Sequence, residues 1–89
     1  MLIPRRSSQF KRDFKLAMKR GLPISKIEKV METLVTETPL EPKHKDHPLS
    51  GDYKGHRECH IEPDWLLIYA ISYPDIFFVR TGSHSDLFK

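Results

Sequence analysis

The segment from Cys59 to Tyr69 constrains the fold of this chain more than any other. It holds a Glu-Pro-Asp turn between two stretches of strand-forming residues. Proline presets φ near −65° for the second position of a type I turn, and the aspartate after it suits the same turn. The apolar run from Trp65 to Ile71 is rich in β-formers and far too short to span a membrane. We therefore expect a β-hairpin whose second strand is central in a sheet, with His60 and Asp64 close together at its turn.

Two amphipathic segments precede this hairpin and predict a pair of helices. Ser7 or Ser8 can cap a first helix that runs to about Arg20, where a following glycine and proline block its continuation. Apolar residues on one stripe predict a second helix from about Ser25 to Glu37. Because the connection between them is short, the two helices should pack as antiparallel neighbours.

Strands are expected at residues 2–6, 53–61, 65–71 and 76–81, and the tail at 83–89 should fold back as a turn. The order strand–helix–helix–strand–strand–strand predicts an α+β fold. In this fold a mainly antiparallel sheet carries the helical pair on one face and leaves the other face open. The whole chain, residues 1–89, should form one domain.

Composition limits the setting in which such a domain works. The single cysteine, Cys59, cannot form an internal disulfide, which fits a reducing compartment. No membrane-length apolar run and no secretion signal stand in the sequence, so we expect a cytoplasmic protein without membrane contact. Fifteen Lys and Arg residues against twelve Asp and Glu, with the basic ones crowded into the first quarter, favour a polyanionic partner. A solvated helix face is the alternative reading of that basic cluster.

Residues 38–52 form a predicted loop that is long for so small a domain, which indicates a functional or mobile segment. The chain has five histidines, and the pairs His44-x2-His47 and His56-x3-His60 have loosely zinc-like spacing. However, no second cysteine supports a metal site, and neighbouring lysines and an arginine would repel a cation. We therefore expect no metal and no cofactor, and we interpret His44 and His56 as ordinary surface residues.

Acid–base chemistry fits His47, His60 and His84 better than metal binding does. Each lies in a loop or at the end of a predicted element, from which side chains can converge on one side of the sheet. The two-residue period of a strand turns Cys59 and Ile61 toward the helices and His60 toward the open face. The three imidazoles are therefore candidates for one active site.

Cleavage of an RNA backbone needs a base for the 2′-hydroxyl, an acid for the leaving 5′-oxygen and cations for the phosphate. Histidine can serve as base or acid without a metal. Arg80, at the end of the last strand, would suit a phosphate clamp, although a structural ion pair with an acidic neighbour is the alternative. Trp65 could stack on a base, with plain core packing as its alternative.

Three motifs in order and spacing strengthen this interpretation: Lys45-Asp46-His47-Pro48-Leu49, the run from His60 to Tyr69, and Arg80-Thr81-Gly82-Ser83-His84 followed by Leu87-Phe88. With them the whole chain resembles the YafQ branch of the RelE/ParE toxin superfamily. That resemblance implies a bacterial type II toxin–antitoxin toxin. Such a toxin is a ribosome-dependent endoribonuclease that cuts mRNA in the ribosomal A site, contacts 16S rRNA, and is silenced by a cognate antitoxin protein.

The resemblance also assigns residues to roles. Catalytic residues would be the three histidines and the hairpin aspartate: His47, His60, Asp64 and His84. Aromatic residues that position RNA would be Trp65 and Phe88, and Arg80 would join His47 in holding the phosphate. Two alternatives share the fold: a ParE-like toxin that binds DNA gyrase without nuclease activity, and an RNA-binding relative that has lost catalysis.

Overall fold

The computed structural model describes residues 1–88, which form a five-stranded sheet with two long helices on one face. The elements are β1 (Ile3–Arg6), α1 (Ser8–Lys19), α2 (Ile24–Val35), the 3₁₀ turn η1 (Pro42–His44), β2 (His47–Pro48), the 3₁₀ turn η2 (Gly51–Tyr53), β3 (Arg57–Glu62), β4 (Trp65–Ser72), β5 (Asp75–Gly82) and α3 (His84–Leu87).

The strands lie in the order β1-β5-β4-β3-β2. Only the β1–β5 pair is parallel, and the other three pairs are antiparallel. The predicted α+β fold with a mainly antiparallel sheet is therefore confirmed. The strand expected from Tyr53 begins only at Arg57, because η2 and the positive φ of Gly55 (87°) turn the chain first.

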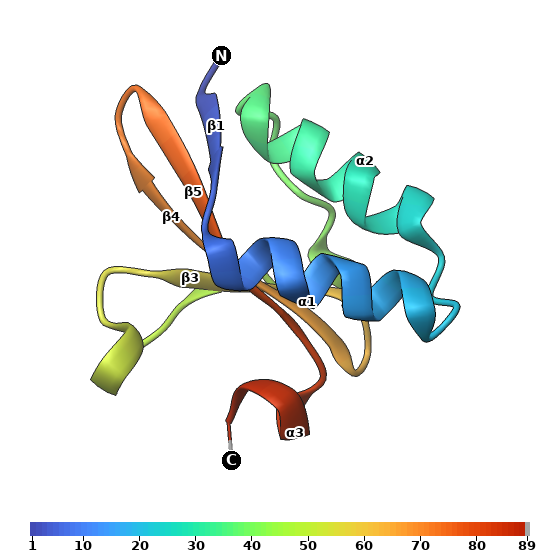
Figure 1. Ribbon diagram of the computed structural model, residues 1–89. Coiled ribbons are helices and arrows are strands. Elements are labelled where there is room, and N and C mark those ends of the chain that lie inside the picture. Colours follow the sequence, from blue (N-terminus) through green and yellow to red (C-terminus); the bar gives the residue numbers. More distant parts are fainter. Residues whose placement is uncertain (89) are drawn as a thin grey trace.

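Ser7 joins α1 to the sheet at the point where the helix begins. Its Oγ accepts a hydrogen bond from the Phe10 backbone N–H (2.9 Å) and donates its own hydrogen to the Val79 carbonyl of β5 (2.8 Å). The helix therefore starts with its axis set against β5. Figure 1 shows α1 crossing in front of the sheet and α2 beside it.

The main core lies between this helical pair and the sheet. Phe10, Ile27, Tyr69, Ile76 and Phe78 are almost completely buried there. As predicted, Cys59 and Ile61 also point into this core. The alternation along β3 therefore leaves the side chain between them, that of His60, on the opposite face.

That opposite face is less open than the sequence suggested. Leu66 and Ile68 of β4 are fully buried beneath Leu49 and Tyr53 of the long loop and Leu87 of the C-terminal segment. Burying these leucine and isoleucine side chains removes apolar area from water, which favours a covered face. The tail, predicted to be a turn, forms the short helix α3 instead.

α3 is fixed at its start by a capping box. The Ser83 Oγ accepts from the Asp86 backbone N–H, and the Asp86 carboxylate accepts from the Ser83 backbone N–H (3.1 and 3.0 Å). The Arg20 guanidinium at the end of α1 donates to the same carboxylate at 2.7 Å. This ion pair attaches α3 to the long helix.

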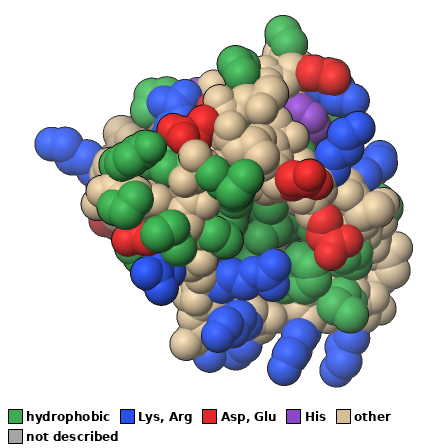
Figure 2. Space-filling view, turned by 90° about the horizontal axis from the view of Figure 1, so that it is seen from above, with side chains coloured by type: hydrophobic (Ala, Val, Ile, Leu, Met, Phe, Trp, Pro, Cys, Tyr) green, Lys and Arg blue, Asp and Glu red, His purple; other side chains and the backbone are tan. Residues whose placement is uncertain are grey.

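In the view from above, Lys and Arg side chains line much of the rim, around hydrophobic and acidic side chains (Figure 2). Among the described residues, no helix combines the length and the apolar character needed to cross a membrane.

Candidate active site

Strand register brings polar side chains from several strands onto the face opposite the long helices. Residues paired directly across neighbouring strands point to the same side of a sheet. One row of such pairs crosses four strands and consists of His47, Glu58, Ile68 and Arg80. The adjacent row consists of His60, Leu66 and Gly82. The polar groups of both rows surround the small apolar cluster formed by Leu66 and Ile68.

Three imidazole rings follow one another across this face. The ring centroids of His47 and His60 are 6.3 Å apart, and those of His60 and His84 are 5.9 Å apart. The structure thus brings together the three histidines that the sequence singled out, from β2, β3 and the start of α3.

His60 and His84 are both held through Nδ1, and Nε2 of each ring has no hydrogen-bond partner among residues 1–88. Nδ1 of His60 lies 3.2 Å from the carbonyl oxygen of Pro63, and Nδ1 of His84 lies 2.8 Å from Oδ1 of Asp64. Because a carbonyl or carboxylate oxygen only accepts, Nδ1 carries the hydrogen in each ring. The Nε2 atoms of both rings are then free to take up or release a proton.

Asp64 lies in the hairpin turn as predicted, but its carboxylate binds His84 rather than the expected His60, whose ring contacts the Pro63 carbonyl instead. Its Oδ1 also accepts from the backbone N–H of His84 at 3.0 Å. This backbone bond, followed by the bond from the His84 ring, lowers the pKa of Asp64. The carboxylate is therefore ionised at neutral pH and fixes both the position and the tautomer of His84.

His47 differs because both of its ring nitrogens face oxygen. Nδ1 lies 2.6 Å from the carbonyl oxygen of Lys45, and Nε2 lies 3.0 Å from Oε2 of Glu58. An unprotonated Nε2 and a carboxylate oxygen are both acceptors and would repel each other at this distance. A proton must therefore lie between them, on Nε2 of His47 or on Oε2 of Glu58. His47 has no ring nitrogen left for proton exchange with a substrate.

Glu58 is a site residue that the sequence did not single out. Its side chain is only 7% exposed, and its Oε1 has no hydrogen-bond partner among the described residues. A buried carboxylate with an unused acceptor is uncommon and calls for a donor. Strand alternation along β3 puts Glu58 on the same face as His60, and this alternation was the only feature of the sequence that could have indicated Glu58.

His44 is not the plain surface residue that was expected. Its Nδ1 lies 2.7 Å from the carbonyl oxygen of His60, so the ring braces the backbone of β3 at the active site. His56, by contrast, packs its ring edge-on against Tyr53, with centroids 5.7 Å apart. His56 thus lies outside the row of histidines and contacts the site only through Tyr53.

Trp65 does not lie where a substrate contact would require. Its side chain is 2% exposed in the core beneath the helices, and its Nε1–H donates to Oγ1 of Thr81 at 2.9 Å. The reason is again alternation, since Leu66 takes the active-site face and its two neighbours take the other. The prediction that Trp65 stacks on RNA is corrected in favour of core packing.

Phe88 is the aromatic residue that the site exposes. It is 43% exposed, and its ring lies 6.3 Å from His84 and packs edge-on against Tyr53 at 6.0 Å. Tyr53 was expected only as the start of a strand. Phe88 could therefore stack on a base with Tyr53 supporting it from behind.

Arg80 makes the structural ion pair that was the alternative to a phosphate clamp. Its Nε donates to Oδ2 of Asp13 at 2.8 Å. The side chain is nevertheless 25% exposed, and its register with Ile68 places Arg80 on the same face of the sheet as Glu58. Asp13, through its hydrogen bond, is the main cause that raises the pKa of Arg80, with the Tyr53 hydroxyl as a minor one. Its charge is therefore permanent.

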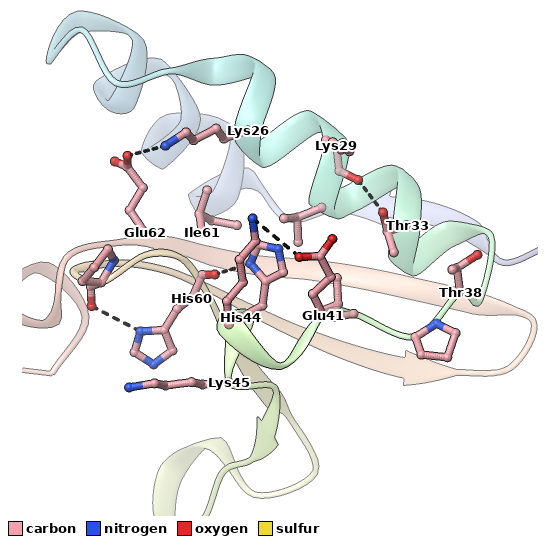
Figure 3. A pocket seen from close by; sticks show the side chains of 15 residues that line it. Lys26, Lys29, Thr33, Thr38, Glu41, His44, Lys45, His60, Ile61 and Glu62 are labelled. Atoms are coloured by element: carbon pink, nitrogen blue, oxygen red, sulfur yellow. Dashed lines mark hydrogen bonds and ion pairs between the residues drawn. The ribbon is translucent and has the colours of Figure 1, made fainter.

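A pocket of about 730 Å³ adjoins the row of histidines on the side of α2. Figure 3 shows α2 along one wall, with Lys26 paired to Glu62, and His44 and Lys45 on the other side near His60. Within residues 1–88, no cluster of three or more His, Cys, Asp or Glu side chains is arranged to hold a metal ion.

Comparison with known proteins agrees with this fold. The family model for the bacterial toxin of type II toxin–antitoxin systems, YafQ, matches residues 3–89. The mRNA interferase toxin YafQ of Escherichia coli K12 is 46% identical over 83 residues, which span 92% of this chain and 90% of the relative.

Solved structures agree over the full length. The crystal structure of YafQ from E. coli BL21(DE3) is 41% identical with a TM-score of 0.95, and the two chains cover each other completely. A metal-bound toxin from Helicobacter pylori is 48% identical with a TM-score of 0.92, over 99% of this chain and 100% of the other. The chain therefore belongs to the YafQ family of bacterial type II toxin–antitoxin toxins.

Proposed function

We propose that this protein is an mRNA interferase, the toxin of a type II toxin–antitoxin pair. One observation carries the proposal: the rings of His60 and His84 are neighbours, with centroids 5.9 Å apart, and within residues 1–88 each ring uses Nδ1 in a hydrogen bond and leaves Nε2 without a partner. Two imidazoles in this arrangement can serve as general base and general acid on either side of one phosphodiester. The related E. coli toxin is named for the same activity.

The reaction needs one proton moved at each end of the phosphate. One Nε2 takes the proton of the 2′-hydroxyl, and the 2′-oxygen attacks phosphorus. The other Nε2, protonated at the start, gives its proton to the departing 5′-oxygen as the P–O5′ bond breaks. The products are a 2′,3′-cyclic phosphate and a 5′-hydroxyl, and the two rings end with their protonation states exchanged.

Arg80 is assigned to the phosphate because its guanidinium is permanently charged. It would offset negative charge that builds up on the phosphorane. His47 was expected to join Arg80 there, but Lys45 and Glu58 engage both of its ring nitrogens, so it is assigned to holding β2 against β3 beside the site. Phe88 would hold a base beside the cleaved bond.

The expected partners follow from the basic charge of α1 and from the relatives of this chain. The exposed basic side chains of α1, at Lys11, Arg12, Lys15 and Lys19, suit the phosphates of 16S rRNA, with the mRNA in the ribosomal A site as substrate. E. coli YafQ has been crystallised with DinJ in a toxin–antitoxin complex. A cognate antitoxin is the expected partner here, in the cytoplasm.

Primer extension on mRNA from cells that express the chain tests this function. Wild type should arrest growth and produce discrete cuts, whereas His60→Ala and His84→Ala should remove the growth arrest and reduce the cuts to a low residual level. His56→Ala, which removes a histidine outside the row, is the matched control and should still cut. Intact mRNA together with inhibited DNA supercoiling would instead support the gyrase-binding alternative and refute this proposal.

A further inference from the structure

Arg80 reaches the active-site face from a fixed anchor that belongs to a distant part of the chain. The anchor is Asp13, a residue of α1 that is only 8% exposed. Its Oδ2 accepts from Nε of Arg80 at 2.8 Å and from the backbone N–H of Thr81 at 3.1 Å. Its Oδ1 accepts from Nη2 of Arg80 at 3.4 Å and from Nε2 of Gln9 at 3.0 Å.

These contacts fix the plane of the guanidinium. Nε and Nη2 form one edge of that planar group, and the Asp13 carboxylate binds this edge with both oxygens. A guanidinium has five N–H donors, so the Nη1 pair and the second Nη2 hydrogen stay available. The pairing of Arg80 with Ile68 across the sheet puts the side chain on the same face as His60 and Glu58.

We propose that Asp13 is a positioning residue for the cleavage reaction: it holds Arg80 so that the free edge of the guanidinium meets the phosphate. This inference rests on the proposed function and names a residue of α1 that the catalytic set did not include. An arginine side chain that is fixed beforehand loses little rotamer freedom when the transition state forms. Without the anchor, Arg80 would still carry its charge but would sample many orientations.

The informative substitution is Asp13→Asn. Asparagine has nearly the same volume, and its one oxygen can still accept from the Thr81 N–H and from Nε of Arg80, but its NH₂ group cannot accept from Nη2 and it carries no charge. The bidentate contact between the carboxylate and the guanidinium is therefore lost, while most of the side-chain packing is kept. Asp75→Asn is the matched control, because Asp75 makes an exposed bond to Arg5 (3.3 Å) at the opposite end of β5.

A double-mutant cycle separates positioning from folding. Cleavage of a defined mRNA on ribosomes is measured for wild type, Asp13→Asn, Arg80→Ala and the double variant, with the melting temperature of each. We expect Asp13→Asn to lower kcat by about tenfold to a hundredfold, the scale of a misplaced catalytic group. In the Arg80→Ala background the same change should leave kcat unaltered, and Asp75→Asn should cleave like wild type.

Two results would overturn the inference. One is an Asp13→Asn effect of equal size with and without Arg80, which would mean that Asp13 acts through stability alone. The other is wild-type cleavage by Asp13→Asn or by Arg80→Ala. If wild type itself does not cleave mRNA, the proposed function fails instead, so the two failures are distinguishable.

Discussion

Gly82 offers the sharpest test of how α3 carries His84 into the site. A Cβ added at this position would lie 2.9 Å from Cβ of Asp86 and 3.0 Å from its Oδ2. Carbon atoms pack at about 3.5–4.0 Å. Since Cβ of Asp86 is attached directly to the backbone, rotation of the side chain cannot relieve the clash. α3 itself must move, by roughly 0.6 Å or more to reach that contact distance.

Gly82→Ala should therefore disturb both the cap of α3 and the placement of His84. Loss of a capping interaction costs about 0.5–2 kcal/mol. For a domain of this length, 1 kcal/mol lowers the melting temperature by roughly 4–8 °C. Catalysis should suffer more than stability, because displacing a reacting group by about 1 Å can cost about a hundredfold.

The assay compares the melting temperature and mRNA cleavage of Gly82→Ala with those of Ser85→Ala, which alters an exposed residue of the same helix. We expect Gly82→Ala to lose at least about tenfold in cleavage and Ser85→Ala to retain it. Wild-type cleavage and an unchanged melting temperature for Gly82→Ala would show that α3 accommodates the methyl group. In that case the close approach of Gly82 to Asp86 does not position His84.

Further predictions concern the aromatic residues and the attachment of α3. Phe88→Ala should raise KM for mRNA with little change in melting temperature, because the ring is exposed beside His84. Trp65→Phe should leave KM unchanged and lower the free energy of unfolding by about 1–3 kcal/mol, since Oγ1 of Thr81 loses a buried hydrogen-bond donor. Hydrogen bonding to Arg20 is the main cause that lowers the pKa of Asp86 below 3.8. The stabilisation is fully present above the pKa that Asp86 has in the unfolded chain and disappears as pH falls below about 4. In a pH series, the melting temperature of Arg20→Ala should therefore fall less steeply at acid pH than that of wild type.

Local periodicity accounts for much of what the sequence predicted. Alternation along β3 correctly turned Cys59 inward and His60 outward, and the turn residues placed Asp64 at the hairpin. The same rule, applied along β4, puts Trp65 on the core side. The RNA-contact prediction for Trp65 failed because family resemblance was given more weight than strand alternation.

Contacts between distant segments were harder to predict. The His47–Glu58 contact depends on the path of a long loop that ends in the two-residue strand β2, and no local pattern specifies such a path. The covering of Leu66 and Ile68 depends on Leu87, in a tail too short to show a helical stripe. Asp13 looked like one more polar residue of a basic helix until the fold placed it against Arg80.

The central claim is that His60 and His84 exchange protons with one phosphodiester, and a pH–rate profile tests it most directly. Cleavage by wild type should follow a bell-shaped profile, with one limb for the base and one for the acid. Residual cleavage by His60→Ala should lack one of the two limbs, and residual cleavage by His84→Ala should lack the other. The missing limb identifies each histidine as the base or the acid. A profile that keeps both limbs in both variants would contradict the claim.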